Sequence, residues 1–528
     1  MKKFLKLLPR LLLPGILIAG ALLRLKLYLE NRSFWLDEAW LALDISLRSL
    51  GDIAATKVLA LDMPVVPMGF ALVERLIILA WNNHEYALRL FPLICGMGAL
   101  WLFCVLTKKW LELPGRFLAV ILFSFSWALI LYSTEVKQYS TDLAVGLGLY
   151  AVYVLWGEEI SRTRFFLSWC LAGMLALFFS YNAVFVLAGI ALVQIVRCLR
   201  MRNGRRGTTL ASIYVFWLIC LGCFHGGALR IMLFNPTLSK GATARQFFPP
   251  APGFTWGTVV WSGQTIWDFV VGFLGLGPGW AAGALLAVGS AAFFRNRREP
   301  LFVLSFPSVL ALAGALFHVY PFGHRFLLFA APFVFVLVGA GLDLLWRTPS
   351  KVWRIAGIFL AVMLTAGVVR GGTRFLFKPY DHGQYRSAIR HLNRQMRPGD
   401  VLYLNHSAKY LYGYYIKYDP LQAEIAPVGK LSDTVAHEEG RPYILRQFVW
   451  HDFSHPRLVV LARRYGEVVK LKADQPHAFG TNPRTWILLA HFQPVLKQFI
   501  LSLADRSGKP VNVTRRPGVD LYLYDFSR

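Results

Sequence analysis

Long apolar runs, separated by clusters of Lys and Arg, constrain the fold of this chain more than any other feature. Hydrophobic residues make up 56% of its 528 residues, a larger share than soluble domains carry. An apolar run of about 20 residues can cross the hydrocarbon core of a bilayer as a helix, and the runs predict about 11 such spans. We therefore expect an α-helical polytopic membrane protein. The predicted spans are residues 10–29, 87–107, 117–133, 142–157, 165–181, 183–199, 209–233, 278–294, 301–319, 326–346 and 353–370.

The basic clusters predict how the chain is oriented in the membrane. Lys and Arg collect in cytoplasmic loops, and the predicted spans allow two crossings between successive clusters. This places the N-terminus in the cytoplasm and the C-terminal region outside it. The net charge of +27 is explained by these cytoplasmic loops and by basic residues that contact lipid headgroups. No nucleic-acid partner is therefore expected. The clusters are Lys2–Lys6, Lys108–Arg116, Arg162–Arg164, Arg197–Arg206, Arg295–Arg298 and Arg347–Arg354.

Residues 64–81 form an apolar run that is not counted as a span. Glu74 and Arg75 lie at its centre, and an ionised group there would cost about 2.5–3.5 kcal/mol on insertion. We expect this segment to lie in the outer membrane interface as a helix. The alternative is a twelfth span, which would move every later loop to the other side of the membrane.

The polar C-terminal region, residues 371–528, is predicted to be an extracytoplasmic α/β domain that follows a membrane domain at residues 1–370. Helical periodicity alternates in this region with short buried or alternating strands, the pattern of a small mixed sheet. The expected helices are 383–396 and 407–417, and the expected strands are 401–405, 457–462, 485–490 and 521–526.

Three predicted outer loops bring acids and bases to one membrane face. A carboxylate at a partly desolvated interface can take a proton from a hydroxyl or an amine. Arg and Lys can bind a phosphate and stabilise it as it leaves. Together they suit sugar transfer from a lipid-linked phosphate, although helix capping or an interfacial ion cluster would use the same residues. The candidates are Asp37 and Glu38 in the first loop, Glu135, Lys137, Tyr139 and Asp142 in the second, and His324 and Arg325 in the fifth.

The motifs resemble those of the polyprenyl-phosphate-sugar-dependent glycosyltransferases of the GT-C fold, which include protein O-mannosyltransferases, aminoarabinose transferases and rhizobial lipopolysaccharide sugar transferases. FWLDEAW (34–40) is similar to the family's first acidic motif, which implies that Asp37 is the general base and that Glu38 assists it. NHEYALRLFPLICGMGALWLF (83–103) and YSTEVKQYSTDLA (132–144) resemble the next two motifs. The acid of the second outer loop supports the first in this family, which implies supporting roles for Glu135 and Asp142. Tyr139 is expected either to support the site by stacking on a sugar or to lie in the aromatic belt of the membrane interface.

The resemblance also assigns the donor phosphate. PFGHRFLLFAAP (321–332) resembles the late segment whose arginine contacts that phosphate, which points to Arg325 with its neighbour His324. Aminoarabinose transferases carry a Lys-Pro-Pro element in the first outer loop, but the counterpart here, LDMPVVPMG (61–69), has no lysine. Phosphate binding is then expected from Lys137 or Arg325 instead. In the fourth loop, Lys240 and Arg245 are expected to meet either acceptor or headgroups.

The sequence thus predicts a multi-pass glycosyltransferase, hexosyl or pentosyl, in the inner (plasma) membrane. It would move a sugar, with inversion, from a polyprenyl-phosphate donor to an extracytoplasmic glycolipid, polysaccharide or protein. No cofactor or metal is expected, although Asp37 with Glu135 or Asp142 could hold a divalent cation. The alternatives are a transporter or lipid-linked-sugar flippase, or a non-catalytic scaffold. Transporters usually carry charges near the midplane and internal repeats, whereas the charges here gather at span ends.

Overall fold

The computed structural model divides the chain into two compact units. The helical unit comprises Met1–Glu30, Leu50–Leu76 and Arg89–Pro379. The mixed unit comprises Asn31–Ser49, Ile77–Leu88 and Tyr380–Arg528. The described residues are 2–55, 66–155, 161–202, 204–234, 246–378, 380, 383–397, 400–418, 444–450, 458–464, 467–470, 484–491, 494–506 and 508–526.

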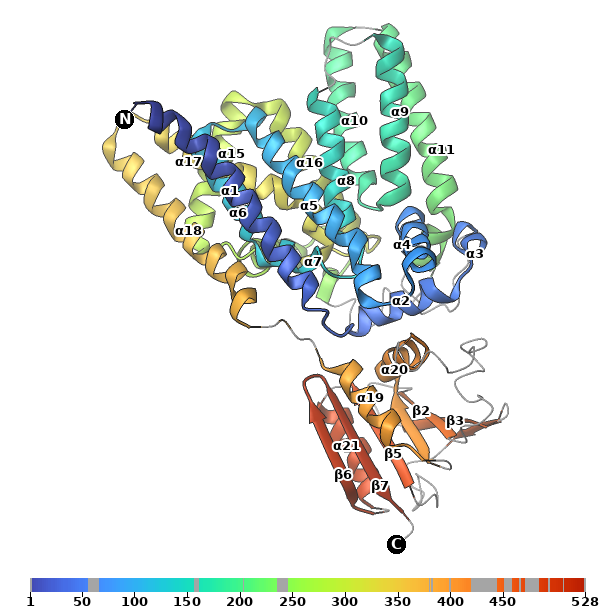
Figure 1. The fold of residues 1–528 in the computed structure, drawn as a ribbon. Coiled ribbons are helices and arrows are strands. Elements are labelled where there is room, and N and C mark those ends of the chain that lie inside the picture. The colour runs from blue at the N-terminus through green and yellow to red at the C-terminus, as the bar shows by residue number, and fades with distance from the viewer. Residues whose placement is uncertain are drawn as a thin grey trace. The chain divides into compact units, whose positions relative to one another are not determined.

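Long helices make up most of the helical unit, as the hydrophobic runs predict (Figure 1). Among the described residues, eight helical segments are long and apolar enough to cross a membrane, which indicates a multi-pass membrane protein. They lie in α1 (Lys2–Leu29), α5 (Glu85–Trp110), α9 (Arg162–Phe179), α10 (Ala183–Met201), α11 (Gly204–Phe234), α16 (Arg298–Leu316), the pair η2 (His324–Ala330) and α17 (Ala331–Arg347), and α18 (Lys351–Phe377).

The other three predicted spans coincide with helices that do not reach this length and hydropathy, so the count of 11 stays a prediction. The predicted span 117–133 is broken at Ser126, whose hydroxyl donates to the carbonyl of Leu274 at 3.0 Å. The remaining helices are α3 (Leu50–Ala54), α4 (Met68–Trp81), α6 (Leu113–Phe125), α7 (Trp127–Tyr132), α8 (Tyr139–Leu155), α14 (Trp256–Trp267), η1 (Asp268–Phe273) and α15 (Gly279–Asn296).

Residues 64–81, predicted to lie in the interface, contain α4. This helix has 14 residues, fewer than the roughly 20 that a span requires. Glu74 on α4 is completely buried. The position of α4 relative to a membrane stays a prediction.

Helix α17 is the central helix of the helical unit, and glycine contacts hold its neighbours close. A Cβ atom at Gly115 of α6 would lie 2.3 Å from the carbonyl oxygen of Gly339, and one at Gly289 of α15 would lie 1.9 Å from that of Leu337. Small residues let membrane helices approach closely enough for their backbones to pack. The α17 stretch around Gly339 and Gly341 therefore fits between α6 and α15.

The described residues of the mixed unit form a seven-stranded sheet, in agreement with the predicted α/β class. The strand order is β4-β3-β2-β1-β5-β7-β6. Strand β1 runs parallel to β2 and β5, and the other neighbours are antiparallel. The strands are β1 (Val401–Asn405), β2 (Ile444–Trp450), β3 (Leu458–Arg464), β4 (Glu467–Lys470), β5 (Arg484–Ala490), β6 (Pro510–Arg516) and β7 (Val519–Asp525).

Among the described residues, four helices lie wholly within the mixed unit, and one of them comes from the first predicted outer loop. Helix α2 packs on α20, and α19 packs beside β6 and β7 (Figure 1). The helices are α2 (Leu36–Leu47), α19 (Tyr385–Gln395), α20 (His406–Tyr418) and α21 (Pro494–Asp505). The sequence-based prediction divides the chain at a single position, residue 370. The mixed unit also contains residues 31–49 and 77–88 from the N-terminal part of the chain.

Candidate functional site

The acid pair of the first motif begins helix α2. Trp35 has extended backbone geometry, and Asp37 and Glu38 lie in the first helical turn, where carboxylates complement the positive end of the helix dipole. Glu38 is fully buried, and its Oε2 accepts from the Trp35 backbone N–H at 3.4 Å. Asp37 is only half-buried. The two acids thus differ in burial, and Glu38 caps the N-terminus of α2 by accepting this hydrogen bond.

Helix α2 is held against aromatic side chains of α20, more than 360 residues later in the chain. Trp40 stacks on Tyr410 with ring centroids 4.9 Å apart, and the Phe34 ring lies 5.0 Å from that of Tyr414. The Phe34 backbone N–H donates to the Tyr415 hydroxyl at 2.7 Å. The backbone just before Asp37 is therefore anchored by the C-terminal region.

Glu85, the acid of the second motif, belongs to the same anchor. Its Oε1 accepts from the Tyr415 hydroxyl at 3.1 Å and from the Arg386 guanidinium at 2.9 Å. Arg386 also donates to the carbonyl of Asn31 at 2.6 Å. Glu85 therefore joins α20 and α19 to the chain that leads into α2.

In the helical unit, Asp142 joins three of the predicted outer loops. Its carboxylate accepts from the Ser180 hydroxyl at 2.5 Å and from the Asn182 side-chain amide at 3.0 Å. The Tyr320 hydroxyl in turn donates to the Asn182 amide oxygen at 2.6 Å. Asp142, Ser180 and Asn182 are all buried. The second predicted outer loop, the short connection at residues 180–182 and the fifth outer loop thus meet in one hydrogen-bond network.

Arg325 and Tyr139 lie together beside this network. The Arg325 guanidinium carbon is 6.0 Å from the centroid of the Tyr139 ring, within the range of a cation–π contact. His324 lies beside Phe273, with ring centroids 5.6 Å apart. Both Arg325 and His324 are half-buried among these rings.

Glu135 and Lys137 lie in the turn before Tyr139. Both side chains are buried, with 1% and 6% of their surface exposed. The Lys137 backbone N–H donates to the Glu135 carbonyl at 2.7 Å. The helical unit thus holds six of the predicted site residues, and the mixed unit holds Asp37 and Glu38.

Sequence reasoning missed Ser180, Asn182 and Tyr320 as parts of the site. Ser180 and Asn182 belong to a short polar stretch between two apolar runs. This pattern is typical of any connection between two helices, so it does not indicate a functional site. Within the described residues, no group of three or more His, Cys, Asp or Glu could hold a metal ion. Lys240, Arg245 and residues 61–65 of LDMPVVPMG lie outside the described residues.

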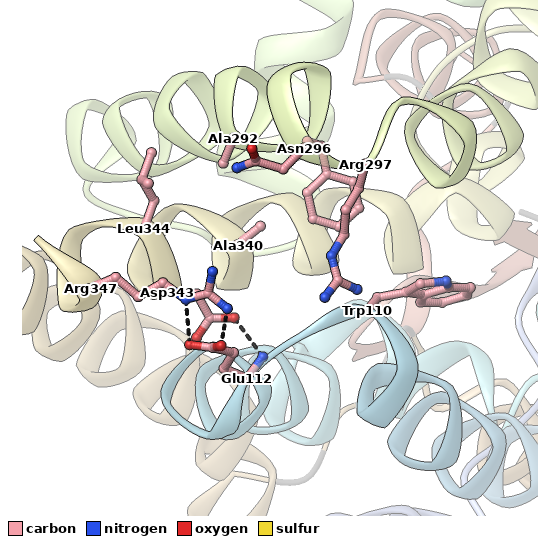
Figure 2. Close-up of a pocket in the computed structure, with 10 residues that line it drawn as sticks. Trp110, Glu112, Ala292, Asn296, Arg297, Ala340, Asp343, Leu344 and Arg347 are labelled. Atoms are coloured by element: carbon pink, nitrogen blue, oxygen red, sulfur yellow. Dashed lines mark hydrogen bonds and ion pairs between the residues drawn. The ribbon is translucent and has the colours of Figure 1, made fainter.

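A second polar cluster lies where predicted cytoplasmic clusters of the helical unit meet (Figure 2). Asp343 of α17 accepts from the backbone N–H groups of Glu112 at 2.8 Å and Gly115 at 2.7 Å. Arg347 pairs with Glu112, and Arg297 donates to the carbonyl of Lys109 at 2.8 Å. These contacts cap the start of α6 and tie three basic clusters together. The small cavity beside them, about 60 Å³, is lined by none of the predicted site residues.

Comparison with known proteins identifies the fold. No protein-family model matches the chain, and no curated protein matches it in sequence. Two solved structures of ArnT from Cupriavidus metallidurans do match, each with a TM-score of 0.52 and each covering 96% of this chain and 97% of ArnT. The apo structure is 11% identical and the structure bound to undecaprenyl phosphate is 12% identical. ArnT is a GT-C fold glycosyltransferase, so the chain described here has the GT-C fold that its motifs predict.

Proposed function

We propose that the protein is a membrane glycosyltransferase that moves a sugar from a polyprenyl phosphate to an extracytoplasmic acceptor. The observation that carries this proposal is the fold, shared over 96% of the chain with an ArnT structure bound to undecaprenyl phosphate. The FWLDEAW motif adds the acid that such a reaction needs. The donor sugar is carried on a lipid phosphate and not on a nucleotide, so no nucleotide-binding loop is required.

Asp37 is the proposed general base. Its carboxylate takes the proton of an acceptor hydroxyl or amine as the acceptor atom attacks the anomeric carbon of the sugar. The bond from that carbon to the phosphate oxygen breaks on the opposite face, and polyprenyl phosphate leaves with inversion of the sugar. Half-burial of Asp37 supports this role, because the carboxylate is partly desolvated yet accessible. Glu38, buried against the Trp35 backbone, assists by fixing the first turn of α2.

Arg325, Lys137 and His324 are the proposed ligands of the donor phosphate. A guanidinium can donate two parallel hydrogen bonds to phosphate oxygens, and an ammonium adds a compact charge. The phosphate gains negative charge as the sugar departs, so cations fixed beforehand in an aromatic, poorly hydrated region stabilise the transition state. The aromatic rings of Tyr139 and Phe273 around Arg325 and His324 support this assignment.

Glu135, Tyr139 and Asp142 are proposed to support the site. Asp142 holds the second loop to Ser180 and Asn182, and so fixes the turn that carries Lys137. Tyr139, the first residue of α8, offers its ring to Arg325 of η2. We further propose that the chain resides in the inner (plasma) membrane with its N-terminus cytoplasmic and its C-terminal region outside. A glycolipid, polysaccharide or protein remains the proposed acceptor class, and the sugar is a hexose or a pentose.

A transfer assay tests this function. The purified full-length protein in detergent is given a panel of radiolabelled polyprenyl-phosphate sugars and a membrane glycolipid extract. Wild type is compared with Asp37→Asn, which keeps the size of the side chain but removes its basicity. Asp52→Asn, another half-buried acid of the first loop, is the matched control. We expect transfer by wild type and by the control, and a loss of about 100-fold or more for Asp37→Asn at an unchanged melting temperature.

The other outcomes distinguish the alternatives. Equal transfer by all three proteins would remove Asp37 as the base while leaving the enzyme intact. Movement of labelled lipid across a vesicle membrane, without transfer of sugar to an acceptor, would replace the transferase by a lipid-linked-sugar flippase.

A further inference from the structure

A basic pocket lies in the mixed unit, between α19 and β6. Its volume is about 430 Å³, large enough for a small polyanionic group. Four of its six lining residues are arginines, and none of the six is a carboxylate. The lining residues are Arg386, Ser387, Arg390, His391, Arg394 and Arg516.

The arginines of α19 form a stripe that helix stability alone does not favour. Arg386, Arg390 and Arg394 follow one another at intervals of four residues, so they lie on the same helix face, and like charges at this spacing destabilise a helix. Arg386 is also in the first turn, where a positive charge opposes the helix dipole. The opposite face, with Ile389 and Leu392, is buried. A bound anion would turn this repulsion into attraction.

The opposite wall of the pocket is held in place by neutral partners. Arg516 of β6 donates to the Ser387 hydroxyl at 3.2 Å and to the Gln384 amide oxygen at 3.4 Å. A hydrogen bond of 3.4 Å joins Thr514 to the His391 ring. Arg386 is fixed by its ion pair with Glu85. The guanidinium groups are therefore positioned from both the helix and the strand.

We propose that this pocket binds phosphate groups of an anionic ligand. Guanidinium groups present paired N–H donors that match the geometry of phosphate oxygens. Such a phosphate could belong to a lipid headgroup or to a soluble phosphorylated molecule, and both would meet the same arginines. The proposal concerns binding alone and does not depend on Asp37 or on sugar transfer.

Binding of pyrophosphate to the full-length protein in a neutral detergent tests the proposal by calorimetric titration. The pocket variant is Arg390→Gln with Arg394→Gln, which keeps long polar side chains and relieves the like-charge repulsion on α19. The control variant is Arg506→Gln with Arg515→Gln, two exposed arginines of the same unit outside the pocket lining. We expect wild type and control to bind within about twofold of each other and the pocket variant at least about tenfold more weakly.

A second titration distinguishes the two sources of the phosphate. Short-chain phosphatidic acid and matched phosphatidylcholine replace pyrophosphate, with the same three proteins. Pocket-dependent binding of phosphatidic acid but not of phosphatidylcholine supports a lipid headgroup, whereas pocket-dependent binding of pyrophosphate alone supports a soluble ligand. The proposal fails if the pocket variant binds both anions as the control does, or if wild type binds neither. Melting curves of all three proteins show that any loss is not a loss of folding.

Discussion

At the residue scale, Asp142 explains how a charged side chain can be buried in the helical unit. Two donors, Ser180 and Asn182, satisfy its carboxylate. Replacing Asp142 by Asn keeps the shape but turns one acceptor into a donor that faces the Asn182 amide group. A buried donor without an acceptor costs about 1–3 kcal/mol, so we expect the free energy of unfolding in detergent to fall by that amount.

A double-mutant cycle provides the control for this prediction. Ser180→Ala removes one donor to the same carboxylate, so its effect and that of Asp142→Asn should not add. Independent, additive effects of the two substitutions would contradict a shared hydrogen-bond network.

At the element scale, glycine positions decide how closely α17 packs on its neighbours. Gly115→Ala would place a methyl group 2.3 Å from the Gly339 carbonyl oxygen and 2.6 Å from the Asp343 carboxyl carbon. Helices α6 and α17 would have to separate, which would also strain the hydrogen bond from the Gly115 N–H to Asp343. We expect a loss of about 1–3 kcal/mol or more in the free energy of unfolding, the cost typical of overpacking.

Gly98→Ala is the matched control, because a Cβ atom at Gly98 of α5 meets nothing within 4 Å. Its melting temperature should equal or exceed that of wild type, since Ala favours a helix by up to about 1 kcal/mol. If both substitutions lowered the melting temperature equally, close packing at Gly115 would not be the cause.

At the scale of the whole molecule, the chain joins its N-terminal acid motif to its C-terminal region within one unit. Trp40 of α2 stacks on Tyr410 of α20. Aromatic pairs contribute about 0.5–1.5 kcal/mol beyond the area they bury, so we expect a coupling energy of that size in a cycle of Trp40→Ala and Tyr410→Ala. Because α2 carries Asp37, we also expect Trp40→Ala to lower the transfer rate at a temperature where the protein stays folded.

Trp353→Ala serves as the control for this prediction. Trp353 lies on α18 of the helical unit with 58% of its surface exposed, so its loss should leave the transfer rate unchanged. A coupling energy near zero for Trp40 and Tyr410 would mean that the aromatic contact does not hold α2.

Much of the fold follows from local sequence pattern. Each predicted span overlaps one or more described helices, and the predicted strands of the C-terminal region appear as β1, β3, β5 and β7. Strands β2, β4 and β6 are not predicted by the sequence. Strand β6 begins at Pro510, and its residues are mostly exposed, so it lacks the alternation of a half-buried strand. Hydrophobic periodicity predicts a helix or strand when one face of that element is buried. It predicts poorly the edge strands of a sheet, because most of their residues are exposed.

The sequence by itself determined the class of the protein, its apolar helices and the motifs that resemble those of GT-C glycosyltransferases, with the acids and bases that these motifs carry. Only the tertiary structure decided their partners. Phe34 meets Tyr415 across more than 380 positions of the chain, Asp142 meets Ser180 and Asn182 from another loop, and Arg516 completes the pocket of α19 from a distant strand. The physical reason is range: hydropathy and periodicity act between near neighbours in sequence, whereas a buried polar group is satisfied by whichever distant residue the packed fold brings to it.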